Sequence, residues 1–200
     1  MQTISHELLE KRFQSVAGLA TLDATDRFFF LNCLNSRLRD AWGRVDWPEL
    51  IQLIEIPVSS DSVATNTTDV INYDVLEAWN RNPYTDRQAS KVEYRIINSK
   101  IVLSTAYDQS SVFVLAKKEF LDYDFGASDI PRFFENYLIS ACLADFFRGD
   151  GQTEKAGIEE ARAEEYLLRQ MDRVEKLQQQ NQPSVSVYPI SQTQTMIYQN

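Results

Sequence analysis

The chain has 200 residues, of which 44% are hydrophobic, which predicts one folded domain with at most an appended segment. Its formal net charge is −9, and an acidic surface repels phosphate backbones, which argues against a protein that reads nucleic-acid sequence. No apolar run reaches the roughly 18 residues of a membrane span, and the first residues lack the basic and apolar regions of a signal peptide. We therefore expect a soluble protein of a reducing cytoplasm with no membrane partner.

Two helices are predicted near the N-terminus. The first covers about residues 5–17, where apolar residues recur at helical spacing, and Gly18 ends it. The second covers about residues 25–42 and has Asp23 or Thr25 as its cap. Together they predict a helical hairpin.

The sequence pattern changes from helical spacing to short strand-like runs over residues 46–123, which predicts a β-rich insertion. Three short runs have strand character, namely 70–79, 92–105 and 111–118. Asn98-Ser99 indicates a hairpin turn inside the second run. We expect a small antiparallel sheet inserted between two helical hairpins.

A second helical hairpin follows the insertion. Ile130-Pro131 is predicted to open a helix that runs through Phe147 and is apolar almost all round. The glycines of 149–151 break it, and a long helix of Ala, Glu, Arg, Leu and Gln covers about 153–180. The predicted fold is thus mainly α: a four-helix bundle of two helical hairpins over residues 1–182, with a small antiparallel β insertion.

Residues 183–200 predict an extended C-terminal arm. The segment has neither a helical period nor a charged side chain, and it is too apolar for a comfortable solvated tail. Such a strand is a candidate for adding onto another subunit's sheet or groove, and a frayed terminus is the alternative. The predicted partner-binding residues of the arm are Val185, Val187, Tyr188, Ile190, Met196, Ile197 and Tyr198.

The residues that carry enzyme chemistry are scarce, and we predict no catalytic residue, metal or cofactor. His6 is the single histidine and is interpreted as ordinary helix surface or a capping contact. Cys33 and Cys142 lie far apart in apolar helical patterns and are interpreted as buried free thiols. The carboxylate pairs at 159–160 and 164–165 lack the Glu-x-x-His of a metal-binding bundle and indicate a solvated helix face.

Aromatic residues are more numerous than one core explains. Neighbours on a helix diverge by about 100°, so the phenylalanines of 28–30 cannot all face one core. Some should reach a second surface, which indicates contact between subunits. The candidate subunit-interface residues are Phe29, Phe30, Trp42, Phe133 and Phe147.

One block of sequence resembles a known family. Residues 141–156 read ACLADFFRGDGQTEKA, and residues 160–168 read EARAEEYLL before Asp172-Arg173. This block resembles the head-to-tail adaptor (connector) proteins of tailed bacteriophages, in which a helix ending in an alanine- and aspartate-rich turn meets a long final helix. The segment Asp46–Leu50 is similar to the proline-bearing exit of that family. The resemblance covers about residues 5–180.

The resemblance implies a structural protein of the virion neck, assembled in the host cytoplasm. It implies a homo-oligomeric ring of about twelve copies beneath the portal protein, with a channel through which DNA passes without sequence recognition. It further implies contact with the next neck or tail protein, and a C-terminal arm that grips the portal. The alternative is a small non-enzymatic binding module, chaperone-like or regulatory, whose arm captures a partner. A nuclease is disfavoured because the acidic–histidine metal cluster is missing.

Overall fold

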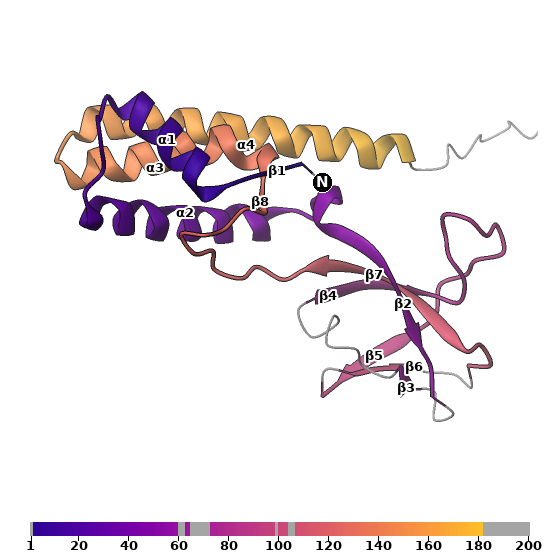
Figure 1. Ribbon diagram of the computed structural model, residues 1–200. Helices are drawn as coiled ribbons and strands as arrows, with labels where there is room; N and C mark the ends of the chain where they lie inside the picture. The colour runs from indigo at the N-terminus through magenta and orange to yellow at the C-terminus, as the bar shows by residue number, and fades with distance from the viewer. Residues whose placement is uncertain (1, 60–62, 65–72, 99, 104–106, 182–200) are drawn as a thin grey trace, which may run out of the picture.

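The computed structural model describes residues 2–59, 63–64, 73–98, 100–103 and 107–181, with side chains as far as residue 177. A helical part and a β part lie side by side (Figure 1), and each has a hydrophobic core of its own. Of the described residues, 50% are helical and 23% lie in strands, which form three sheets. The prediction of a mainly α bundle with a small insertion is therefore wrong: this is a mixed α/β protein.

Local capping signals set the ends of the first two helices. In α1 (His6–Ala17) the Ser5 hydroxyl accepts a hydrogen bond from the Leu8 amide at 3.3 Å, and Gly18 ends the helix at φ 72°. In α2 (Ala24–Arg44) the Asp23 carboxylate accepts from the Asp26 amide at 2.8 Å. Both helices confirm the prediction from sequence.

Helices α3 (Glu135–Gly149) and α4 (Thr153–Asn181) form the most extensively packed pair in the chain. The turn between them uses Gly151 at φ 74°, and the Gln152 amide donates to the Phe147 carbonyl at 2.8 Å. A stripe on α4 is buried and consists of Ala156, Ala163, Leu167 and Val174, the last three within the helical core. Figure 1 shows that α4 then continues past the other helices, and Leu177 is exposed there.

Two details of the predicted bundle need correction. Helices α1 and α2 pack more extensively on α3 than on each other. They therefore do not form a packed helical hairpin, whereas α3 and α4 do. The third helix does not open at Ile130-Pro131. These residues form the short strand β8 (Ile130–Pro131), which pairs antiparallel with β1 (Thr3–Ile4), and a 3-10 turn, η2 (Arg132–Phe134), precedes α3. The N-terminal segment supplies this pairing, and helical periodicity cannot reveal it.

The β part contains two three-stranded antiparallel sheets. One has the order β2-β7-β4, from β2 (Ile51–Pro57), β7 (Ser111–Lys118) and β4 (Tyr73–Trp79). The other has the order β3-β6-β5, from β3 (Val63–Ala64), β6 (Lys100–Leu103) and β5 (Tyr94–Ile97). Alternate residues of β7 and β6, among them Val112, Val114, Ile101 and Leu103, share one core. This second core makes the insertion a structural unit.

Aromatic and charged side chains join the two parts where α2 passes through η1 (Pro48–Leu50) into β2. Trp47 is fully buried there, and its indole N–H donates to the Ala41 carbonyl at 2.8 Å. The buried Lys117 ammonium of β7 donates to the Val45 carbonyl at 2.9 Å and pairs with Asp46 at 3.2 Å. The chain therefore enters and leaves the β part through a fixed joint.

A half-buried charge network joins three helices. Arg37 of α2 donates two hydrogen bonds to Asp145 of α3, at 2.8 and 2.6 Å, and two to Glu160 of α4, at 2.7 and 2.8 Å. Arg148 contacts the same two carboxylates at 2.8 and 3.1 Å. Hydrogen bonds from Arg37 lower the pKa of Glu160 below its ordinary value. The network fixes the register of α2 against the α3–α4 hairpin.

Candidate functional site

The cysteines are not placed for nucleophilic chemistry. Both are free thiols; Cys142 is buried and Cys33 is half-buried. Burial raises the pKa of Cys33 to about 11 and that of Cys142 well above its usual range. A thiol with a raised pKa holds little thiolate at neutral pH and is a poor nucleophile. Among the residues with described positions, no group of three or more His, Cys, Asp or Glu side chains could hold a metal ion.

The prediction that His6 is helix surface or makes a capping contact is wrong: its side chain is fully buried, and among the described residues neither ring nitrogen has a hydrogen-bond partner. Its ring packs against Phe30 and Phe125, with centroids 5.6 and 5.5 Å away, and its backbone N–H donates to the Ala127 carbonyl at 2.8 Å. Glu10 lies 3.8 Å from the imidazole Nδ1, beyond hydrogen-bond distance. A loop far along the chain covers the start of α1, and this burial cannot be read from local sequence.

We predict that His6 makes stability fall in mild acid. Burial lowers the pKa of His6 below its ordinary value of 6.5, although the Glu10 carboxylate opposes the shift. Below 6.5 the unfolded chain binds a proton that the folded chain excludes, so stability is lost as the pH falls through that value. Urea midpoints at about pH 7.5 and about pH 5.5 should therefore differ more for the natural chain than for His6→Phe. An equal drop in both proteins would contradict the prediction.

The phenylalanines at the start of α2 divide between two surfaces, as their spacing predicts. Phe30 is buried and contacts Phe13, with ring centroids 4.7 Å apart. Phe28 and Phe29 are 58% and 39% exposed. Phe28 is not isolated, because its ring lies 5.8 Å from that of Phe125. An aromatic patch thus lies on the outside of the helical part.

The structure changes the list of candidate interface residues. Phe30 and Trp42 are buried in the core of the same chain, so they are unavailable to a neighbour. Phe133 and Phe147 are half-buried against that core, and Phe133 packs on Trp47 with centroids 5.4 Å apart. Of these five residues, Phe29 alone is exposed. The seven predicted residues of the arm, Val185 to Tyr198, lie outside the described residues.

The loop over residues 119–129, which we call the strap, runs along α2 from β7 toward β8. The Asn35 side chain holds it by two hydrogen bonds: its amide donates to the Tyr123 carbonyl at 3.0 Å, and its oxygen accepts from the Tyr123 amide at 2.9 Å. Arg39 pairs with Asp122 at 2.5 Å. The strap is therefore a built part of the surface, and Leu121 and Phe125 remain 55% and 40% exposed on it.

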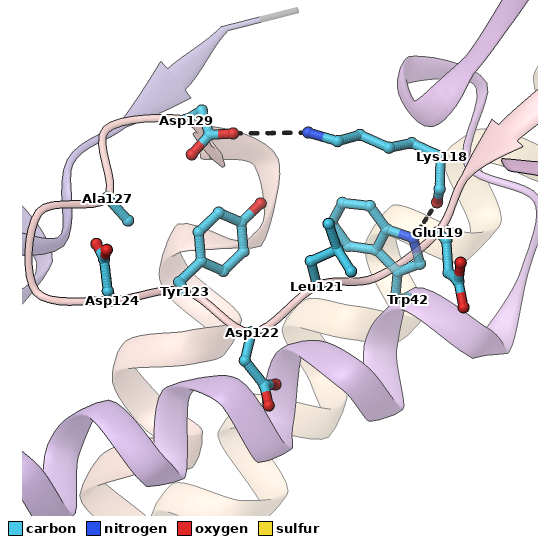
Figure 2. A pocket seen from close by; sticks show the side chains of 9 residues that line it. All are labelled: Trp42, Lys118, Glu119, Leu121, Asp122, Tyr123, Asp124, Ala127 and Asp129. Carbon is cyan, nitrogen blue, oxygen red and sulfur yellow. Dashed lines mark hydrogen bonds and ion pairs between the residues drawn. The ribbon is translucent and has the colours of Figure 1, made fainter. Parts of the chain in front are cut away.

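A shallow cavity of about 240 Å³ opens between the strap and the end of α2 (Figure 2). Trp42, Leu121 and Tyr123 line it with apolar surface. The indole N–H of Trp42 already donates a hydrogen bond to the Lys118 carbonyl at 2.8 Å. Four of its lining residues carry carboxylates, namely Glu119, Asp122, Asp124 and Asp129. Asp122 points toward α2, where it pairs with Arg39, and Asp129 pairs with Lys118 at 3.6 Å.

This arrangement suits recognition of another surface. An apolar depression with an acidic rim accepts an apolar side chain that is flanked by positive charge. Sequence reasoning missed the strap, although a signal exists: Phe120, Leu121, Tyr123 and Phe125 are interleaved with three acidic residues over 119–125. Single aromatic residues in a loop form neither a helical nor a strand pattern, so the sequence pattern did not predict a site there.

Comparisons with known protein families and with characterised proteins find no match for this chain. Within the part of the chain that the structure describes, no helix combines the length and the apolar character needed to cross a membrane.

Proposed function

We propose that the chain is a subunit of a head-to-tail adaptor ring of a tailed bacteriophage, joining the portal to the next neck or tail protein around a channel for DNA. The resemblance that suggests this lies in residues 141–156 and 160–173. In the structure these segments are the end of α3, the turn at Gly151 and the first two thirds of α4. The resembling block is thus one continuous helical hairpin.

The observation that carries the proposal is apolar surface exposed in clusters on both parts of the molecule. Phe28, Phe125 and Leu121 are exposed on and beside the strap, and Ile96 and Ile97 are exposed on β5. Exposed apolar clusters of this kind mark contacts with other proteins. A ring of identical subunits needs two different faces on every copy, and two separate clusters supply them.

The action proposed for the ring is geometric. Its subunits hold two other rings in register and leave a passage between them. A formal net charge of −9 on each subunit disfavours capture of the DNA backbone during passage.

The decisive experiment measures assembly of the purified chain, alone and with the portal protein of the same phage. Mass photometry and negative-stain electron microscopy should show rings, free or stacked on the portal. A chain that stays monomeric in the presence of portal overturns the proposal. If the same monomer captures an unrelated client polypeptide, the alternative of a chaperone-like binding module gains the support that the ring loses.

Removal of the arm should uncouple portal binding from folding. A chain ending at Gln182 keeps the whole described fold, so its thermal midpoint should stay unchanged, whereas its affinity for portal should fall by at least about tenfold, or 1.4 kcal/mol. Co-sedimentation with portal measures the loss. Replacing the apolar Val187, Tyr188 and Ile197 by alanine should reproduce it.

The matched control for the arm replaces its polar residues Gln192, Thr193 and Gln194 by alanine, which leaves the apolar set intact. Portal binding by this variant should equal that of the natural chain. If the truncated chain bound portal as tightly as the natural chain, the arm would not be part of the portal contact.

A further inference from the structure

The hairpin of β5 and β6, residues 94–103, is the positive counterpart of the strap, and we call it the basic hairpin. Arg95, Ile96 and Ile97 on β5 and Lys100 on β6 are all exposed. Arg95 faces Val102 and Ile97 faces Lys100 in the antiparallel register, so these side chains share the outer face of the sheet. On that face Ile97 lies opposite Lys100 and two positions from Arg95 on the same strand, whereas Ile96 pairs with Ile101 and lies on the other face.

The ion pairs of the described residues do not use these cations. Most of the other positive side chains are engaged, as in the pairs of Arg37 with Asp145 and of Arg44 with Asp40. By contrast, neither Arg95 nor Lys100 enters an ion pair in the described part of the chain. A cation that enters no ion pair among the described residues and lies beside exposed isoleucine is suited to a contact with an acidic, apolar surface.

A second feature of the basic hairpin is its edge. The sheet order β3-β6-β5 places β5 at the margin of its sheet, and Asn98, at φ 49°, forms the turn at its end. Protein sheets shield exposed edges with charge, and an edge that carries exposed isoleucine invites association. The hairpin belongs to the β part, whereas the strap runs along α2 in the helical part (Figure 1).

We propose that the basic hairpin of one copy docks onto the strap of the next copy. Ile97 fills the cavity beside Trp42, and Arg95 and Lys100, on the same face of the hairpin, meet the carboxylates near it. This inference rests on the proposed ring and names the contact that builds it. The occupant is a second copy because an apolar cavity lined by carboxylates suits an isoleucine flanked by cations, and the same chain presents Ile97 with Arg95 and Lys100 on its other part.

The geometry of such a contact is heterologous. The hairpin of each copy contacts one neighbour and its strap contacts the other neighbour, so the same contact repeats around a closed ring. Phe28 and Phe125, which touch each other beside the strap, extend the apolar surface that the neighbour covers. Because the rim is solvent-exposed, the charged contribution should weaken as salt is added.

Charge reversal on either side tests the inference. Arg95→Glu with Lys100→Glu makes the hairpin acidic, and Glu119→Lys with Asp122→Lys makes the strap basic. Each double variant should self-associate about 10- to 100-fold more weakly than the natural chain, because like charges then meet. Sedimentation velocity over a concentration series gives the affinities, and circular dichroism shows that each variant is folded.

Mixing the two double variants is the sharper measurement. The acidic hairpin of the first matches the basic strap of the second, and the natural hairpin of the second matches the natural strap of the first. An equimolar mixture should therefore assemble as alternating copies, although neither variant assembles alone. Failure of the mixture to recover assembly, with both variants folded, overturns the proposed contact.

The matched control for the hairpin variant is Arg87→Glu with Lys176→Glu, which lowers the net charge by the same amount as that variant at exposed positions outside both surfaces. It should assemble like the natural chain; equal weakening by this control would mean that net charge acts rather than the contact. Rings formed normally by both double variants would overturn the contact and leave the adaptor function standing. A natural chain that forms no ring with portal overturns the function itself.

Discussion

Replacement of Arg37 by methionine should lower the free energy of unfolding by about 2–3 kcal/mol, less than full burial would give because the site is partly exposed. The arginine joins α2, α3 and α4 through four hydrogen bonds to Asp145 and Glu160. Its loss leaves two half-buried carboxylates with Arg148 as their remaining cation in the network. Urea denaturation at neutral pH measures the change.

Arg39→Met is the control for this measurement, since Arg39 lies on the same helix and also pairs with an aspartate. Its pair with Asp122 is exposed, with relative side-chain areas of 61% and 58%. Such a pair contributes less than about 1 kcal/mol. Equal losses for both variants would show that the Arg37 network has no special role.

The Arg37 effect should also depend on pH. Because hydrogen bonds from Arg37 lower the pKa of Glu160 below the ordinary 4.5, the network stabilises the fold above that value. This contribution is lost as the pH falls through the pKa of Glu160 in the folded protein. The difference between natural chain and Arg37→Met should therefore shrink in acid.

Replacement of Trp47 by alanine should cost about 3–5 kcal/mol, the range for removing a large buried aromatic side chain. The indole is fully buried where α2 passes into the β part, and it packs on Phe133 and Phe134 with centroids 5.4 and 5.0 Å away. Its loss opens a cavity at the joint between the two cores. Differential scanning calorimetry should show a lower midpoint.

Trp47→Phe separates packing from hydrogen bonding at the same position. Phenylalanine keeps most of the ring but cannot donate to the Ala41 carbonyl, so the cost should fall to about 1–3 kcal/mol. A Trp47→Ala variant as stable as the natural chain would contradict the role of this residue in joining the two parts.

The helices could be predicted well because their signals are local. The predicted start near Ser5 is where Ser5 caps α1, and of the two predicted caps of α2, Asp23 and Thr25, Asp23 is the one that caps it. Gly18 and Gly151, both at positive φ, lie where the sequence predicts the ends of helices. Strand β7 was predicted at the residues it occupies, 111–118. Each of these elements depends on residues within one or two turns of its own position.

The fold class could not be predicted because it depends on distant pairing. Strand β2 was missed: Pro57 ends it, and its partner β7 lies some sixty residues away, where Ile51 faces Lys117. That pairing, together with β6 packing on the first sheet, creates the second core. The predicted start of the third helix at Ile130 was wrong for the same reason, because Ile130 pairs with Ile4 near the N-terminus.

The amino-acid sequence alone determined the positions of α1, α2 and α4, the excess of aromatic residues and the acidic charge, because these follow from composition and local spacing. Only the tertiary structure decided that Phe30, Trp42 and His6 are buried, whereas Phe28 and the strap are exposed. The reason is geometric. Burial depends on which distant segment covers a side chain, and the strap, which covers His6 and shapes the cavity at Trp42, lies some eighty to one hundred and twenty positions further along the chain.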